Sequence, residues 1–300
     1  MVAGIFSGAK FDFVEKIGSG GFSQVDLVTC LSSRTHYAMK TVYTNDLEDD
    51  VVQRLHDEAN LLKLITDTKF VVKLYESIKM EDKIVLLLEP CYRGDVGLLL
   101  ERLGSFSESE TKFIAGCVIT GLLHLQSLDI LYRDLKPENL LIDDSGYVKI
   151  SDLGMSRVLS KGGKARTVVG TAEYLSPCMI KCQGYDHKSI IWSLGILVFE
   201  LLTGYPPFTS HNRQELFTKI LNGFKGFDFP DKVFVSVQEI ILMCCRVKPN
   251  QRPNLEYLQR FMWFADFSWK ELNEKSMESP LSKDGQITHE PTTLTKFQEF

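Results

Sequence analysis

The chain has 300 residues, and its 44% hydrophobic and 24% charged content is ordinary for a soluble globular protein. This length is enough for one large domain or for two lobes with ample core. A net charge of −5 argues against general binding to nucleic acid or to anionic membranes. Seven cysteines without the spacing of a disulfide framework indicate free thiols in a reducing compartment, so we expect a cytoplasmic protein.

A glycine-rich turn separates two alternating segments near the N-terminus. Residues 11–17 and 25–29 alternate in hydrophobicity, which predicts two strands joined by this turn. Glycines allow backbone amides to approach phosphate oxygens without an intervening side chain. By itself, such a hairpin is at least as often only a tight turn.

Lys40 lies at the end of the next predicted strand, residues 35–42. A single lysine on a strand is usually a solvated surface charge, so the identity of its partner decides its meaning. Residues 51–64 have apolar side chains at approximately helical spacing, and Glu58 lies near the buried edge of that helix. A carboxylate at this place can pair with Lys40.

The composition changes from strand-rich to helix-rich at residues 89–93. Residues 84–88 predict a buried strand, and Pro90 then interrupts strand pairing. The apolar residues 192–202 are too few to span a bilayer, and they predict a buried helix that ends at Gly204. Two capping boxes predict further helix starts, namely Ser107 with Glu110 and Ser236 with Glu239.

The octapeptide 132–139, Tyr-Arg-Asp-Leu-Lys-Pro-Glu-Asn, has a composition suited to phosphoryl transfer. Asp134 can hold a hydroxyl group for in-line attack, and Lys136 can neutralise charge on a moving phosphoryl group. Asn139 can bind a metal ion. After it, residues 147–150 predict a short strand, and Asp152 follows in the sequence Asp-Leu-Gly.

These elements, in this order, resemble those of the eukaryotic protein kinase superfamily from about residue 11 to residue 264. The resemblance implies a bilobal α+β fold, with a small β-rich N-lobe that has one main helix and a larger helical C-lobe. We expect the following division: an N-terminal extension at 1–10, the N-lobe at 11–88, a hinge at 89–93, the C-lobe at 94–265 and a C-terminal tail at 266–300.

The resemblance implies ATP and Mg²⁺ as cofactors, with Asn139 and Asp152 as metal ligands and Leu88 as the residue before the adenine-binding hinge. The resemblance assigns catalytic roles to Asp134, Lys136, Lys40, Glu58 and Thr171. The implied nucleotide-binding residues are Ile17, Gly18, Ser19, Gly20, Gly21, Phe22, Ser23, Val25, Ala38, Lys40, Glu89, Cys91, Glu138, Asn139, Leu141 and Asp152.

Several motifs resemble those of the AGC group of kinases. Tyr132 before Arg-Asp and the segment 170–175 are characteristic of its cyclic-nucleotide-dependent members, and other segments are most similar to cyclic-GMP-dependent kinases. The cyclic-AMP-dependent catalytic subunit is the second choice. Lys136 with Thr171 favours serine or threonine as acceptor. Since 300 residues leave no room for cyclic-nucleotide-binding domains, the resemblance implies one of two arrangements. Either a separate regulatory domain or subunit is a partner, or this is an isolated catalytic chain or fragment.

Acidic side chains imply protein substrates with an arginine upstream of the phosphorylated residue. Asp95 stands where the family uses a glutamate to bind that arginine, although Asp95 is equally well explained as a helix N-cap, and Glu138 is placed to assist. Thr218 occupies the region where we expect a second acid, so selectivity for a second arginine is not predicted. Thr167 matches the activation-loop phosphorylation site, with Arg133, Arg157 and Arg54 as candidate phosphate ligands.

Two acids of the family pattern are replaced, by Cys178 and by Ile190. Arg252 therefore lacks its expected partner, and we expect it either to move toward solvent or to meet another acid. These losses leave a second function open, a catalytically impaired scaffold. A small-molecule kinase fits poorly with the peptide-docking segment around Thr171. The terminal Phe297-Gln-Glu-Phe300 resembles a tail motif that docks on the small lobe, or it is a frayed end.

Overall fold

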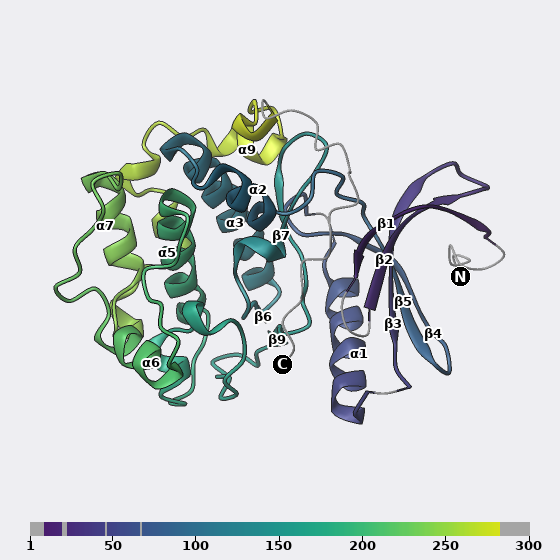
Figure 1. Cartoon of the computed structure of the whole chain (residues 1–300), viewed down its shortest axis with the longest axis horizontal. Coiled ribbons are helices and arrows are strands. Elements are labelled where there is room, and N and C mark those ends of the chain that lie inside the picture. The colour runs from purple at the N-terminus through teal and green to yellow at the C-terminus, as the bar shows by residue number, and fades with distance from the viewer. Residues whose placement is uncertain (1–8, 20–22, 46, 67, 283–300) are drawn as a thin grey trace.

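A five-stranded antiparallel sheet forms the N-lobe of the computed structural model, which describes residues 9–19, 23–45, 47–66 and 68–282 (Figure 1). Four of the strands were predicted to within two residues at either end. The fifth, β4, was missed because its sequence, Leu-Tyr-Glu-Ser-Ile-Lys, has no continuous apolar run. In spatial order the strands are β1 (Phe11–Ser19), β2 (Ser23–Cys30), β3 (His36–Tyr43), β5 (Lys83–Leu88) and β4 (Leu74–Lys79).

The main helix of the N-lobe, α1 (Asp49–Leu64), lies beside this sheet (Figure 1). Ala59 and Leu62 from this helix are buried in the core, and Glu58 is buried with them. A carboxylate is rarely buried without a partner. The helix therefore delivers one acidic side chain into the interior beside β3.

The C-lobe is built around α5 (Lys188–Thr203), which is buried along most of its length. An all-round apolar helix must be covered on all sides, and α3 (Glu108–Ser127) and α7 (Val235–Cys244) pack against it. As predicted, α5 ends at Gly204, whose φ of 84° is left-handed. A Cβ atom there would lie 2.0 Å from the carbonyl oxygen of Gly104, so the site requires glycine.

The remaining helices complete this lobe and the C-terminal segment. The capping box of Ser107 and Glu110 is confirmed at the start of α3. The second predicted box is wrong, because α7 begins at Val235 after Phe234, with Ser236 and Glu239 already inside the helix. The other α-helices are α2 (Val96–Leu103), α4 (Pro177–Ile180), α6 (Arg213–Asn222), α8 (Leu255–Leu258) and α9 (Trp269–Glu274). The 3-10 helices are η1 (Pro137–Asn139), η2 (Ala172–Tyr174), η3 (Pro249–Gln251), η4 (Met262–Phe264) and η5 (Pro280–Ser282).

Two short two-stranded sheets lie where the lobes meet. Strand β6 (Ile130–Leu131) pairs with β9 (Arg157–Val158), and β7 (Leu140–Ile142) forms a hairpin with β8 (Val148–Ile150). The segment after α1 is hydrogen-bonded to this hairpin, with Ile150 N donating to Phe70 O at 2.9 Å. The N-lobe is thus joined to the C-lobe by backbone contacts as well as by residues 89–93. Among the residues that the structure describes, no helix combines the length and apolarity needed to cross a membrane.

Candidate active site

Asp134 is held by hydrogen bonds on both carboxylate oxygens. It follows β6 and is 6% exposed. Thr171 donates to Oδ1 from its backbone nitrogen and from its hydroxyl, each at 2.9 Å. On the other side, Nδ2 of Asn139 donates to Oδ2 at 3.0 Å, and Lys136 Nζ lies 3.7 Å from the same oxygen. The structure therefore brings together the three residues of this loop that were predicted to carry the chemistry and, from outside the loop, Thr171.

Lys40 and Glu58 form the ion pair that the helical spacing predicted. Nζ of Lys40 lies 3.1 Å from Oε1 and 3.4 Å from Oε2 of Glu58. Burial opposes the charged form of Lys40, but the carboxylates of Glu58 and Asp152 outweigh it and raise the pKa of the ammonium group. Lys40 is thus a fixed internal cation and not a solvated surface charge.

Asp152 lies close to this pair at the end of β8. Its φ of 50° is left-handed, an unusual conformation for a residue with a side chain, and Oδ1 accepts a hydrogen bond from Gly154 N at 3.0 Å. The preceding Ser151 is tied to the catalytic loop, since its backbone nitrogen donates to Asn139 O at 2.9 Å. The hydroxyl of Tyr132 donates to Ser151 O at 2.8 Å.

The two predicted metal ligands have the chemistry that Mg²⁺ requires. Asn139 directs its amide nitrogen toward Asp134, which orients the amide oxygen away from that carboxylate. Asp152 offers a second hard oxygen donor. Mg²⁺ is typically bound by one or two such protein ligands together with water and substrate phosphates. Within the described ranges no three His, Cys, Asp or Glu side chains gather as a metal site.

The predicted nucleotide-binding residues of the N-lobe lie on adjacent strands. Ile17, Gly18 and Ser19 end β1, and the last two of these pair with Val25 and Gln24 of β2. Gly20, Gly21 and Phe22 lie outside the described residues. In β3 Ala38 pairs with Leu88, the residue before the hinge. Across the lobe boundary, Leu141 lies in β7. The other nucleotide-binding residues predicted in this lobe also lie on strands. Ser23 and Val25 belong to β2, and Ala38 and Lys40 belong to β3.

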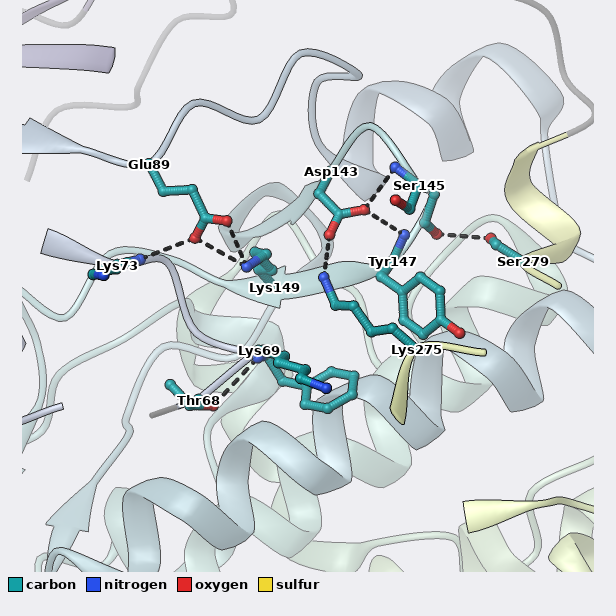
Figure 2. A network of polar contacts seen from close by, with 12 residues as sticks. Thr68, Lys69, Lys73, Glu89, Asp143, Ser145, Tyr147, Lys149, Lys275 and Ser279 are labelled. Carbon is teal, nitrogen blue, oxygen red and sulfur yellow. Dashed lines mark hydrogen bonds and ion pairs between the residues drawn. The ribbon is translucent and has the colours of Figure 1, made fainter. Parts of the chain in front are cut away.

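The predicted hinge residues Glu89 and Cys91 follow β5. The side chain of Glu89 makes an ion pair with Lys149 of β8, and its Oε1 lies 2.7 Å from Nζ (Figure 2). Burial raises the pKa of the Cys91 thiol to about 12, and the Glu89 carboxylate adds to this effect. Cys91 is therefore a neutral thiol at physiological pH. All seven cysteines of the chain carry free thiols.

Three acids meet beside the catalytic loop, and one of them was missed in the sequence. Asp95 caps α2 by accepting a hydrogen bond from Leu98 N at 2.8 Å, and Glu138 lies near it and raises its pKa further. Burial is the main cause of that rise, which takes the pKa of Asp95 to about 6. Burial likewise raises the pKa of Glu200 to about 7, with Glu138 and Glu173 contributing.

Glu200 accepts a hydrogen bond from the hydroxyl of Tyr174. A single glutamate in the apolar run of α5 was the available signal, because charged residues are seldom buried without a purpose. Thr218, which stood in for the second acid, instead lies exposed on α6 and donates to Gln214 O at 2.8 Å. The further acid near Glu138 is therefore on α5 and not on α6.

Thr167 contacts one of the three arginines named for it. Arg133 Nη1 donates to Thr167 Oγ1 at 2.9 Å, and Tyr185 donates through its hydroxyl to Thr167 O at 2.6 Å. Arg157 lies exposed in β9. Arg133 also donates to Met155 O, so its guanidinium group links the segment after Asp152 with the segment around Thr167.

Arg252 keeps its buried position without an acidic partner. It is 2% exposed, its guanidinium group lies 5.4 Å from the centre of the Trp192 ring, and Nη1 lies 3.8 Å from the sulfur of Cys178. The expectation that it would reach solvent or another acid is wrong, since backbone carbonyls satisfy it. Nε donates to Arg246 O at 2.7 Å, Nη1 to Lys188 O at 2.7 Å and Nη2 to Val247 O at 3.2 Å.

Ile190, the other replaced acid, is 4% exposed and belongs to the main hydrophobic core. An apolar side chain at this place gives packing instead of hydrogen bonds to the catalytic loop. The bonds from Thr171 and Asn139 hold Asp134 in position nonetheless. The orientation of the Asp134 carboxylate is thus fixed by Asn139 of the same loop and by Thr171.

Comparison with known proteins gives a consistent result. Residues 11–264 match the protein kinase domain family. The chain is 35% identical to cGMP-dependent protein kinase 2 of Homo sapiens over 288 residues, which cover 93% of this chain and 38% of that protein. It is 35% identical to cGMP-dependent protein kinase, isozyme 2 forms cD5/T2, of Drosophila melanogaster over 275 residues, or 89% and 29% of the two chains.

Identity to cGMP-dependent protein kinase egl-4 of Caenorhabditis elegans is 30% over 292 residues, which cover 95% of this chain and 37% of that protein. The chain thus spans less than two fifths of the length of these relatives. The sheet-rich N-lobe, the helical C-lobe and the order of the motifs agree with the match. The chain belongs to the protein kinase family and, within its AGC group, is similar to the cyclic-GMP-dependent protein kinases.

Proposed function

We propose that the chain is an active serine/threonine protein kinase, which transfers the γ-phosphoryl group of ATP directly to a protein hydroxyl. The observation that carries this proposal is the geometry around Asp134. Thr171 and Asn139 bind one oxygen each, and Lys136 stands beside the second. A carboxylate fixed in this way can orient a hydroxyl group and accept its proton as the phosphoryl group is transferred.

Each remaining part of the site then has a role. Lys40, oriented by Glu58, would hold the α- and β-phosphates, and Lys136 would offset charge on the transferring group. Asn139 and Asp152 would hold Mg²⁺, which neutralises phosphate charge when bound. Most of the rate would come from positioning and electrostatic stabilisation, because the protein itself forms no covalent bond.

We further propose basic protein substrates with an arginine upstream of the acceptor. Asp95, Glu138 and Glu200 place three carboxyl groups beside the catalytic loop, and carboxylates bind guanidinium groups strongly and directionally. Similarity to cyclic-GMP-dependent kinases supports a cyclic-nucleotide-binding regulatory domain or subunit as partner. The free thiols support a cytoplasmic setting. Addition of cGMP to the protein in its native assembly, followed by an activity measurement, tests the regulatory part.

Purified protein, Mg-ATP and an arginine-containing serine peptide test the main proposal. We expect phosphate transfer to serine, and we expect Asp152→Ala and Asp134→Asn to reduce it to background. Background transfer by the unaltered protein and by both variants would instead support the impaired scaffold. The matched control is Asp266→Asn, which alters an exposed carboxylate paired with Lys112 on the C-lobe surface.

A further inference from the structure

The carboxylate of Glu89 in the hinge is bound from two sides. Lys149 Nζ lies 2.7 Å from Oε1 and 2.9 Å from Oε2, and the backbone nitrogen of Lys73 donates to Oε2 at 3.3 Å (Figure 2). Glu89 N in turn donates to Lys73 O at 2.9 Å. The side chain of Lys149 is only 4% exposed. A charge buried to this extent depends on its partner, so the contact has one defined geometry.

Lys149 is the central residue of β8, where it pairs with Leu141 of β7. The hairpin of these two strands connects the two predicted metal ligands, because Asn139 directly precedes β7 and Asp152 lies two residues after β8. A shift of the hairpin would therefore move the phosphate end of the site. Through Glu89, Lys149 attaches the predicted adenine end to this same hairpin.

The far end of the hairpin is fixed by the segment that follows α9. Lys275 makes an ion pair with Asp143, and Tyr147 donates through its hydroxyl to Met277 O at 2.6 Å. Ser279 Oγ donates to Gly146 O at 2.8 Å, and Figure 2 shows this contact and the Lys275–Asp143 pair beside the Glu89 pair. The hairpin is thus anchored independently of the hinge, so the contact between Lys149 and Glu89 holds the hinge in place against it.

We propose that Lys149 is a positioning residue for nucleotide binding, which holds the hinge at a fixed place relative to Asn139 and Asp152. The proposal rests on the proposed kinase function, because it assumes that adenine binds at the hinge backbone. This role requires no contact of Lys149 with nucleotide or metal. It acts through Glu89, and a hinge held in advance loses less conformational freedom when the nucleotide binds.

The test compares Lys149→Met with the unaltered chain by calorimetric titration with adenosine and with Mg-ATP. Adenosine has no phosphates, so it reports the hinge separately from the metal. We expect Lys149→Met to weaken both ligands by the same factor, about tenfold, because one charged hydrogen-bonded contact is lost. We expect kcat at saturating ATP to stay within about twofold, since the catalytic loop keeps its own bonds.

The matched control is Lys112→Met, which removes a lysine whose ion pair with Asp266 is also 2.7 Å long but lies on the C-lobe surface. It should leave both affinities unchanged. Lys149→Gln keeps a hydrogen-bond donor and covers the case in which Lys149→Met fails to fold; we expect a smaller loss of affinity, about threefold.

Unchanged adenosine affinity in a folded Lys149 variant, with a lower melting temperature alone, would overturn the proposal and leave a purely structural role. A fall in kcat without a change in affinity would overturn it as well. If the unaltered chain binds neither adenosine nor Mg-ATP, the proposed kinase function itself fails. The two failures are therefore distinguished by the titration of the unaltered chain.

Discussion

Thr171 donates two hydrogen bonds to the same oxygen of Asp134, one from its backbone nitrogen and one from its hydroxyl, each 2.9 Å long. This arrangement directs the other oxygen toward Asn139 and Lys136. The orientation of the carboxylate therefore depends on a residue that lies 37 positions further along the chain. The predicted peptide-docking segment and the loop of residues 132–139 are joined at this point.

Thr171→Ala should reduce kcat about 10- to 100-fold, because the variant loses one hydrogen bond to a charged group, worth about 1.5–3 kcal/mol. The backbone bond stays, so we expect the fold and the nucleotide affinity to be preserved. Steady-state kinetics with a serine peptide measure the effect. Thr171→Ser keeps the hydroxyl and should retain most activity, and an alanine variant with the kcat of the unaltered chain would contradict the role.

Thr167 is predicted to be phosphorylated, and Thr167→Ala should lower kcat/KM about tenfold or more, because a phosphate there would make charge-assisted bonds to Arg133. Mass spectrometry of the active protein checks the modification, and kinetics check its effect. Ser160→Ala, which alters another hydroxyl of the same exposed segment, serves as the control. Turnover by Thr167→Ala equal to that of the unaltered protein phosphorylated at Thr167 would sink this prediction.

Much of the fold could be predicted because its elements carry strong local signals. Strands β1, β2 and β3 alternate in hydrophobicity, α5 is apolar on every side and α3 starts at a capping box. Strand β4 was missed because Glu76, Ser77 and Lys79 leave it without a continuous apolar run. The false capping box at Ser236 has the right residues at the right spacing. The chain nonetheless enters the helix one residue before it, after Phe234.

The site was predictable where a motif specifies both residue type and spacing, as for Asp134, Asn139 and Asp152. It was not predictable where function depends on the tertiary neighbourhood. Glu200 is remote in sequence from Tyr174, and only packing shows that it receives a hydrogen bond from that hydroxyl. Arg252 shows the same limit, since the loss of an acid in the sequence did not reveal that backbone carbonyls replace it.

Cys178 can be used to test how Arg252 is satisfied. The thiol lies 3.8 Å from the guanidinium group, in place of the acid of the family pattern. Cys178→Glu should have a free energy of unfolding about 1–3 kcal/mol larger than that of Cys178→Gln, because only the glutamate adds a charge-assisted bond to Arg252. The two side chains have nearly the same size, so differences in packing cancel. Equal stability, measured by denaturant unfolding, would mean that the carbonyls already satisfy Arg252.

The pKa of Glu200, raised by burial to about 7, predicts a pH dependence of peptide binding. Below pH 7 the carboxyl group is largely protonated and attracts an arginine less strongly. We therefore expect KM for an arginine-containing peptide to fall as the pH rises from about 6 to about 8. Glu200→Gln should remove the part of this dependence centred near pH 7, while a peptide with alanine for arginine should show little of it. A KM that is constant or rises over this range would contradict the assignment.

The raised pKa of Glu200 also affects the stability of the fold, which should decrease as the pH rises, whereas peptide binding should improve. The folded state holds the proton of Glu200 more tightly than the unfolded state, in which its pKa is near the ordinary value of 4.5. The tighter binding of this proton contributes stability that is fully present below about pH 4.5 and is lost as the pH rises through about 7. Glu200→Gln, which stays neutral, should thus gain stability relative to the unaltered chain between pH 5 and pH 8. Thermal unfolding of both proteins across this range measures the difference, and a gap that narrows with rising pH would show that Glu200 is not held in its protonated form.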